Sequence, residues 1–167
     1  GGICGTAYDN AKISECENLA AVQGINSVGG ICGGSLSSID NCLNRGTVTA
    51  ELDSGGTGGV CGSISAGILS NCYSTGKVQV SAGKYHYVGA VIGVVSRTGY
   101  GEGSVLNCYY LAGSYTTGIG TSAIEGLDRS NAAEKSAAAF AGGEVAALLQ
   151  GAQDTKVWGQ EIGTDAY

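Results

Sequence analysis

Residues 29–36 read Gly-Gly-Ile-Cys-Gly-Gly-Ser-Leu, and residues 58–64 repeat this pattern as Gly-Gly-Val-Cys-Gly-Ser-Ile. A shorter copy, Gly-Gly-Ile-Cys-Gly, stands at residues 1–5, and a variant, Gly-Ala-Val-Ile-Gly, follows at residues 89–93. The position of Cys32 recurs at Cys4, Cys61 and Ile92, so the repeat lengths are 28, 29 and 31 residues. A period of this length is typical of repeat proteins, in which each unit stacks on its neighbours to bury its apolar face.

A second cysteine marks each repeat and follows a polar residue. It lies in the dipeptides Glu15-Cys16, Asn41-Cys42, Asn71-Cys72 and Asn107-Cys108. The seven cysteines therefore form two columns: Cys4, Cys32 and Cys61 in the first, and Cys16, Cys42, Cys72 and Cys108 in the second. Two markers with one period indicate a true internal repeat.

The composition favours strands over helices. The chain has 31 Gly and no Pro in 167 residues, and repeats one to four lack apolar residues at helical spacing. Each repeat offers three strand candidates, and in the third of these Val48, Ala50 and Leu52 alternate with polar residues and face inward. We predict an all-β fold, a parallel β-solenoid of about four coils of ~29 residues with a small mixed α/β C-terminal cap.

The pattern of the cysteines favours packing in the core over a disulfide or metal-binding role. Stacked neighbours would have Cα atoms roughly 5 Å apart, which permits a disulfide, so a bond such as Cys32 to Cys61 stays open as an alternative. An odd number of cysteines leaves at least one thiol unpaired, and the chain has no Cys-x-x-Cys zinc motif. Ile92 takes the cysteine position of the fourth repeat, which indicates a site for a small buried apolar side chain. We predict structural roles for all seven cysteines and no metal or cofactor.

The asparagine of the Asn-Cys dipeptide also has a structural interpretation. Asn41, Asn71 and Asn107 would lie above one another at a corner, where stacked carboxamides hydrogen-bond along the stack and to the turn backbone. Glu15 takes this position in the first repeat, so the predicted ladder ends there.

The pattern changes near residue 113. Residues 130–140 are rich in helix formers, and residues 144–150 predict a second short helix that ends at Gly151. The only Phe and the only Trp of the chain, Phe140 and Trp158, both lie in this part. We therefore divide the chain into Gly-rich solenoid repeats at residues 1–112 and a segment at residues 113–167 that caps or flanks them.

The repeat Gly-Gly-Val-Cys-Gly-Ser-Ile, followed by Ser-Asn-Cys-Tyr-Ser-Thr-Gly-Lys-Val, resembles the GLUG-type repeats of bacterial cell-surface proteins, including adhesin-like and IgA-protease-like proteins. Residues 140–165 resemble the segment that often follows such repeats in proteins of gut anaerobes. The resemblance implies an extracellular solenoid, on the cell surface or secreted, as part of a longer protein with adjoining domains. It brings no catalytic residue. An anaerobic setting would also reconcile export with unpaired thiols.

Charge and hydropathy exclude several classes of partner. Eight Lys and Arg stand against fourteen Asp and Glu, for a net charge of −6, and there is no basic run, so we expect no binding to nucleic acid. The longest apolar stretch, residues 88–95, is far shorter than the roughly 20 residues that span a bilayer, so we expect no direct membrane insertion. The acidic residues of the repeats are scattered and do not recur between coils, which argues against a glycosidase.

One candidate ligand-binding patch remains. Tyr85, His86 and Tyr87 precede the fourth Gly-rich motif, and Tyr100 lies in an enlarged loop after it. Exposed tyrosines stack on sugar rings or pack against protein partners, although covering a corner of the solenoid is the more frequent role. We therefore expect a non-enzymatic extracellular module, a spacer with a surface for a host or cell-surface protein or a glycan. The alternative is a carbohydrate-binding or carbohydrate-processing region of a larger secreted enzyme.

Overall fold

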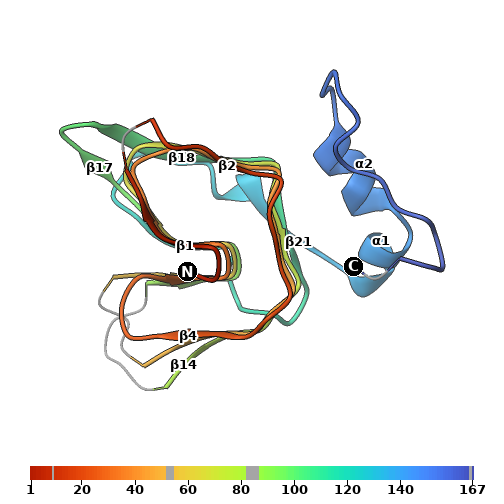
Figure 1. Ribbon diagram of the computed structural model, residues 1–167, viewed down its shortest axis with the longest axis horizontal. Coiled ribbons are helices and arrows are strands. Elements are labelled where there is room, and N and C mark those ends of the chain that lie inside the picture. The colour runs from red at the N-terminus through yellow and green to blue at the C-terminus, as the bar shows by residue number, and fades with distance from the viewer. Residues whose placement is uncertain (9, 52–54, 82–86, 166) are drawn as a thin grey trace.

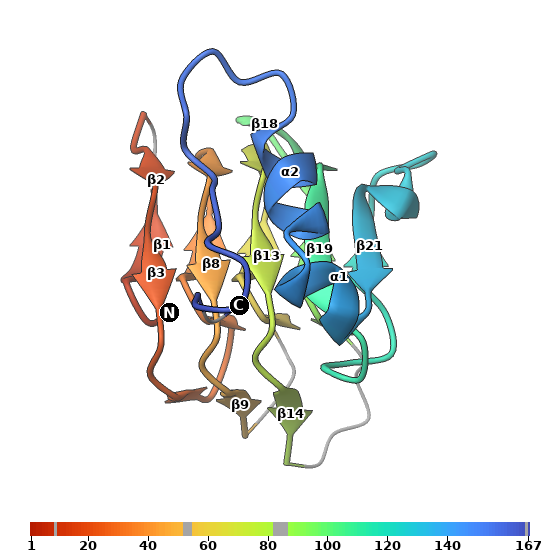
Figure 2. The same ribbon diagram turned by 90° about the vertical axis from the view of Figure 1, so that its right-hand side faces the viewer.

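The computed structural model describes residues 1–8, 10–51, 55–81, 87–165 and 167. The chain winds into a parallel β-solenoid whose coils superimpose when viewed down the stack (Figure 1). Two short helices and the C-terminal segment lie along one side of this stack (Figure 2). None of the helices within the described residues is long and apolar enough to cross a membrane.

Five sheets run along the stack, and each of the first three coils contributes one short strand to every sheet. Sheet A contains β1 (Cys4–Ala7), β6 (Cys32–Ser35), β11 (Cys61–Ile64), β16 (Ile92–Val95) and β20 (Ile119–Ser122). Sheet B contains β2 (Ile13–Ser14), β7 (Ile39–Asp40), β12 (Gly67–Ser70) and β18 (Gly101–Leu106), with β17 (Arg97–Thr98) antiparallel at its edge.

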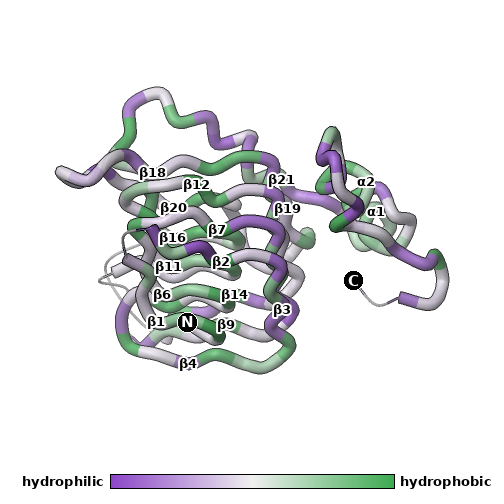
Figure 3. The backbone as a smooth tube through the Cα atoms, turned by 45° about the horizontal axis from the view of Figure 1, so that its top comes forward, coloured by the Kyte–Doolittle hydropathy of each residue, from purple (hydrophilic) through white to green (hydrophobic). Residues whose placement is uncertain are grey.

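The other three sheets complete each coil. Sheet C contains β3 (Glu17–Asn18), β8 (Leu43–Asn44), β13 (Tyr73–Ser74), β19 (Cys108–Leu111) and β21 (Ala132–Lys135). Sheet D contains β4 (Val22–Gly24), β9 (Val48–Ala50) and β14 (Val78–Val80). Sheet E contains β5 (Val28–Gly29), β10 (Thr57–Gly58) and β15 (Val88–Gly89). Figure 3 shows the successive coils as layers.

The register of the stack follows the sequence repeat. Cys4, Cys32, Cys61 and Ile92 are successive partners along sheet A, and Ile119 extends this row by one more strand. The prediction of a parallel β-solenoid of about four coils is thereby confirmed. Val48 and Ala50 are fully buried, as the alternating pattern predicted, whereas Leu52 lies outside the described residues.

Each of the first three coils has five short strands instead of the predicted three, because the backbone turns within two of the expected segments. One turn falls at Asn41, Asn71 and Asn107, whose φ angles of 52°, 50° and 51° lie in the left-handed region. Asn adopts this conformation more readily than other non-glycine residues, which accounts for its recurrence at the corner. Glu15 takes the same conformation in the first coil, with a φ of 54°.

The solenoid continues beyond the predicted boundary at residue 112. β20 pairs with β16, and β21 pairs with β19, so both belong to the stack and form a partial fifth coil. The predicted helix at residues 130–140 is therefore wrong in its first half. Ala132–Lys135 consists of good helix formers, but its ladder with β19 outweighs this local preference. The short 3-10 helix η1 (Arg129–Asn131) precedes it.

Two helices follow the last strand. α1 (Ala137–Ala141) begins after Ser136, whose side chain accepts a hydrogen bond from the backbone of Ala139. α2 (Glu144–Gln150) agrees with the predicted bounds and ends at Gly151, which has a φ of 45°. Both helices lie against the outer face of sheet C near β13 and β19 (Figure 2), so this part flanks the stack and does not cover its end. We call residues 136–167 the tail.

Candidate ligand-binding cleft

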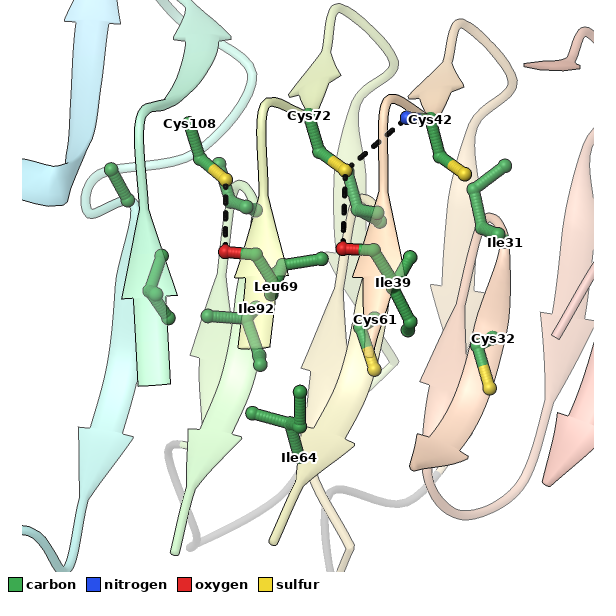
Figure 4. Close-up of a cluster of buried hydrophobic side chains, with 14 of the residues drawn as sticks. Ile31, Cys32, Ile39, Cys42, Cys61, Ile64, Leu69, Cys72, Ile92 and Cys108 are labelled. Carbon is green, nitrogen blue, oxygen red and sulfur yellow. Dashed lines mark hydrogen bonds between the residues drawn. The ribbon is translucent and has the colours of Figure 1, made fainter. Parts of the chain in front are cut away.

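The cysteine columns form part of the core, as Figure 4 shows for Cys32, Cys42, Cys61, Cys72 and Cys108. The five are buried among isoleucines and leucines, while Cys4 and Cys16 in the first coil are half-buried. All seven are free thiols, and among the described residues no group of three His, Cys, Asp or Glu side chains could hold a metal ion.

Each thiol of the second column donates to a backbone carbonyl two residues earlier. Cys72 Sγ, for example, lies 3.0 Å from the carbonyl oxygen of Ser70. Burial raises the pKa of the Cys72 thiol well above its ordinary value, because the thiolate would lose its hydration. A thiol that stays protonated is a poor nucleophile, so this geometry suits core packing.

The corner asparagines form a ladder that is interrupted once. Asn107 Nδ2 donates to Asn71 Oδ1 at 2.8 Å, but Asn71 Nδ2 donates to Asp40 Oδ1 at 3.0 Å instead of to Asn41. Asn41 turns toward the tail and binds Gln153 and Trp158. The predicted ladder is therefore present between two coils, and its third member anchors the tail.

The described part of the tyrosine patch is not assembled into one surface. Tyr85 and His86 lie outside the described residues. Tyr87 is half-buried, and its backbone carbonyl accepts a hydrogen bond of 2.8 Å from Thr57. Tyr100 is 81% exposed in the turn between β17 and β18. Tyr87 directly precedes β15 of sheet E, whereas Tyr100 lies in the β17–β18 hairpin at the edge of sheet B.

A cleft between the tail and the outer face of sheet C is the better candidate site. It has a volume of about 240 Å³. Its floor comes from coils 2 and 3, and its walls come from α1, α2, residues 158–160, Asp165 and Tyr167. Its lining residues include Leu43, Arg45, Tyr73, Phe140, Trp158 and Gln160.

The alternation of sheet C places the floor residues. Asn44 points inward and is fully buried, so its neighbours Leu43 and Arg45 face the tail. Asn44 Nδ2 donates to the Gly46 carbonyl at 2.8 Å, and its Oδ1 accepts from Asn18 Nδ2 at 2.7 Å. These bonds fix the backbone from which Leu43 and Arg45 project.

The tail closes over Tyr73, which is 7% exposed. The Tyr73 ring lies 5.5 Å, centroid to centroid, from the rings of both Phe140 and Trp158, and Phe140 stacks on Tyr167 at 5.7 Å. Burial raises the pKa of the Tyr73 hydroxyl, and the nearby Arg45 opposes this shift. Three of the wall residues, Phe140, Trp158 and Tyr167, are aromatic.

Gln150 and Asn41 hold the tryptophan in place. The Oε1 atom of Gln150 accepts hydrogen bonds of 2.9 Å from the backbone nitrogens of Val157 and Trp158. The indole of Trp158 donates to Asn41 Oδ1 at 2.8 Å. Together these bonds define one wall of the cleft.

The polar groups of the cleft combine an ion pair with unpartnered donors. Arg45 Nη1 lies 3.3 Å from Glu17 Oε1, and Asp165 Oδ2 accepts a hydrogen bond of 2.6 Å from the Glu161 backbone. Arg45 Nε and Gln160 Nε2 are buried and have no hydrogen-bond partner. Both are N–H donors, and both belong to residues that line the cleft.

A smaller hollow of about 200 Å³ adjoins the cleft and shares Leu43 and Trp158 with it. Glu15, Cys16 and Glu17 of the first coil line its far side. The Glu17 to Arg45 ion pair joins the two spaces, since Glu17 lines the hollow and Arg45 lines the cleft.

Sequence reasoning missed this cleft. The two repeats align residues 40–48 with residues 70–78, and Leu43 and Arg45 differ from their counterparts Tyr73 and Thr75. These differences on an outward face, together with the single Phe and single Trp of the tail, were the available signal. The alignment does not show which face the tail covers.

Comparisons with known proteins found no significant match to the chain. No family model matches the chain, and no curated protein or solved structure matches it significantly. The resemblance to GLUG-type repeats therefore stays a prediction.

Proposed function

We propose that the chain is a non-enzymatic binding module of a larger surface protein, with the solenoid as a rigid support and the cleft as the ligand-binding site. The observation that carries this proposal is the cleft itself, which is lined by the aromatic rings of Phe140, Trp158 and Tyr167 and by two residues whose buried donors lack partners. Concave sites that combine apolar walls with a few directed polar groups are typical of ligand binding.

The stack supports the role of a rigid frame. Sheets A and C each contain five strands, and the same residue positions pair from coil to coil. Continuous ladders fix the outer face of sheet C, so Leu43 and Tyr73 are held at a constant spacing beneath the tail. A preorganised floor reduces the ordering cost of binding.

The path of the tail favours presentation of a surface over simple spacing. After β21 the chain turns back along the side of the stack, and its C-terminal end lies beside earlier coils (Figure 2). Hydrogen bonds from the tail reach Asn41 in coil 2 and Asn107 in coil 4. The two ends are therefore not separated by the full height of the solenoid.

The location is proposed on the repeat motif. Because the Gly-Gly-Val-Cys-Gly-Ser-Ile repeats resemble those of bacterial surface proteins, we place the module outside the cell, on the surface or secreted. A host protein, a neighbouring-cell protein or a glycan is then the expected partner.

A mixed ligand screen tests the binding role. Small neutral sugars, carboxylates, amines and aromatic compounds would be screened by saturation-transfer NMR, with the fluorescence of Trp158 as second readout. We expect at least one class to bind saturably and to be recovered unchanged. An Ala146→Leu variant, which fills the cleft, should lose this binding, whereas Ala138→Leu on the exposed face of α1 should keep it. Binding by no class, or conversion of a bound compound, would contradict the proposal.

A further inference from the structure

The two unpartnered donors specify what a ligand must offer. Arg45 Nε and Gln160 Nε2 are both buried, and both lie on residues that line the cleft. A buried N–H without an acceptor is unfavourable, so a ligand that supplies two acceptor oxygens removes an existing cost as it binds. Hydroxyl, carbonyl and carboxylate groups all meet this first condition.

Charge distinguishes between these groups. Glu17, which lines the adjoining hollow, already pairs with Arg45 at 3.3 Å, and Asp165 contributes a carboxylate to the lining of the cleft. One cation against two carboxylates leaves the site net negative, which disfavours an anionic ligand. Asp165 uses one oxygen to accept from the Glu161 backbone and retains acceptor capacity for a ligand hydroxyl. A neutral compound with several hydroxyls satisfies both requirements.

The walls favour a ring with an apolar face. Trp158 and Tyr167 are half-buried residues that line the cleft. Their rings contact those of Tyr73 and Phe140, which also line it. A pyranose combines C–H groups on one face with hydroxyls around its edge, which matches aromatic walls and polar groups in one site. A volume of about 240 Å³ limits the site to a small ligand.

We propose that the cleft binds a neutral pyranose ring, free or at the end of a glycan. Its hydroxyl oxygens accept from Arg45 Nε and Gln160 Nε2, one hydroxyl donates to Asp165, and its C–H face packs on Trp158 and Tyr167. This assignment rests on the proposed binding function and names its ligand class. It places the sugar site on sheet C and the tail, away from the tyrosine hairpin.

The test uses the full chain and methyl glycosides of glucose, galactose and mannose. Trp158 is the only tryptophan, so its fluorescence reports on the cleft. We expect saturable binding of at least one neutral glycoside with a dissociation constant of about 1 mM. Glucuronate should bind at least about tenfold more weakly, because its carboxylate meets a net negative site.

Two variants assign the site. Arg45→Lys keeps the charge beside Glu17 but removes the Nε donor, and Gln160→Ala removes the other donor. Each should weaken glycoside binding about tenfold, the effect expected for one lost hydrogen bond to a ligand, with an unchanged melting temperature. Arg97→Lys is the matched control, because Arg97 pairs with Glu102 in the β17–β18 hairpin outside the cleft.

The outcomes separate this inference from the proposed function. If only carboxylates or amines bind at the cleft, the module binds ligands but the pyranose assignment is wrong. If glycosides bind and Arg45→Lys and Gln160→Ala both leave the affinity unchanged, the site lies elsewhere and the assignment is again overturned. Loss of binding in Tyr100→Ala would place the sugar at the hairpin.

Discussion

The indole Nε1 of Trp158 donates a hydrogen bond of 2.8 Å to Oδ1 of Asn41, a residue 117 positions earlier in the chain. Gln153 binds the same carboxamide at both ends, since its Nε2 donates to Asn41 Oδ1 and its Oε1 accepts from Asn41 Nδ2. One corner residue of the second coil thus holds the tail in place and sets one wall of the cleft.

Replacement of Asn41 should therefore release the tail. Asn41→Gly keeps the left-handed backbone conformation but removes the carboxamide. We expect the free energy of unfolding to fall by about 2 kcal/mol and Trp158 emission to shift to the red, because several hydrogen bonds are lost. Urea titration followed by fluorescence measures both effects. Asn71→Gly is the control, since Asn71 has the same φ but no bond to the tail; an equal red shift there would refute the anchor role.

The buried hydrogen bonds of Asn44 beneath the cleft lead to a second prediction. Asn44 is fully buried and connects Asn18 Nδ2 at 2.7 Å, the Gly46 carbonyl at 2.8 Å and Ser74 Oγ at 3.4 Å. Asn44→Ala should lower the free energy of unfolding by about 3 kcal/mol, because buried partners lose their hydrogen bonds. Chemical denaturation measures the change. Asn10→Ala, at an exposed position, should change stability by less than about 0.5 kcal/mol.

Gly59, which lies against the side chain of Ser74, leads to a third prediction. A Cβ atom on Gly59 would collide with the carbonyl oxygen of Ala90 and the side chain of Ser74. We expect Gly59→Ala to destabilise the fold by about 3 kcal/mol, because two backbone layers would have to separate. Gly5→Ala is matched to it, since a Cβ there meets nothing within 4 Å. Similar melting temperatures for the two variants would show that the coils can separate without cost.

The buried thiol of Cys72 predicts a loss of stability at alkaline pH. Burial raises the pKa of Cys72 above its ordinary value of 9.0, so this thiol stabilises the fold fully below pH 9. As the pH rises above 9, the unfolded chain loses its proton first, and stability falls until the folded pKa is reached. The slope contributed by one thiol approaches about 1.4 kcal/mol per pH unit.

Urea titrations between pH 8 and pH 10.5 check this dependence. Cys72→Ala should show a shallower decline than the parent chain, although its stability at pH 8 is lower. The comparison is between slopes, so the cavity created by the substitution does not affect it. Parallel declines in the two proteins would mean that Cys72 titrates normally in the fold.

Most of the solenoid could be predicted from the sequence, but the cleft could not. The rows through Cys32 and Asn71 could be predicted because equivalent positions of repeats of similar length stack in register. β21 was mistaken for a helix because Ala, Glu and Lys prefer helices, and only its pairing with β19 decides otherwise. The cleft depends on how Trp158 meets Asn41 across the chain, a contact that no repeat specifies.

The return of the tail along the stack also bears on how the protein unfolds. In an open solenoid each coil contacts only its neighbours, so the ends can fray one coil at a time. Here the tail binds coil 2 through Asn41 and coil 4 through Asn107, which couples coils that do not touch each other. Opening coil 3 or coil 4 therefore requires the tail to detach as well, and coils 2 to 4 behave as one cooperative unit.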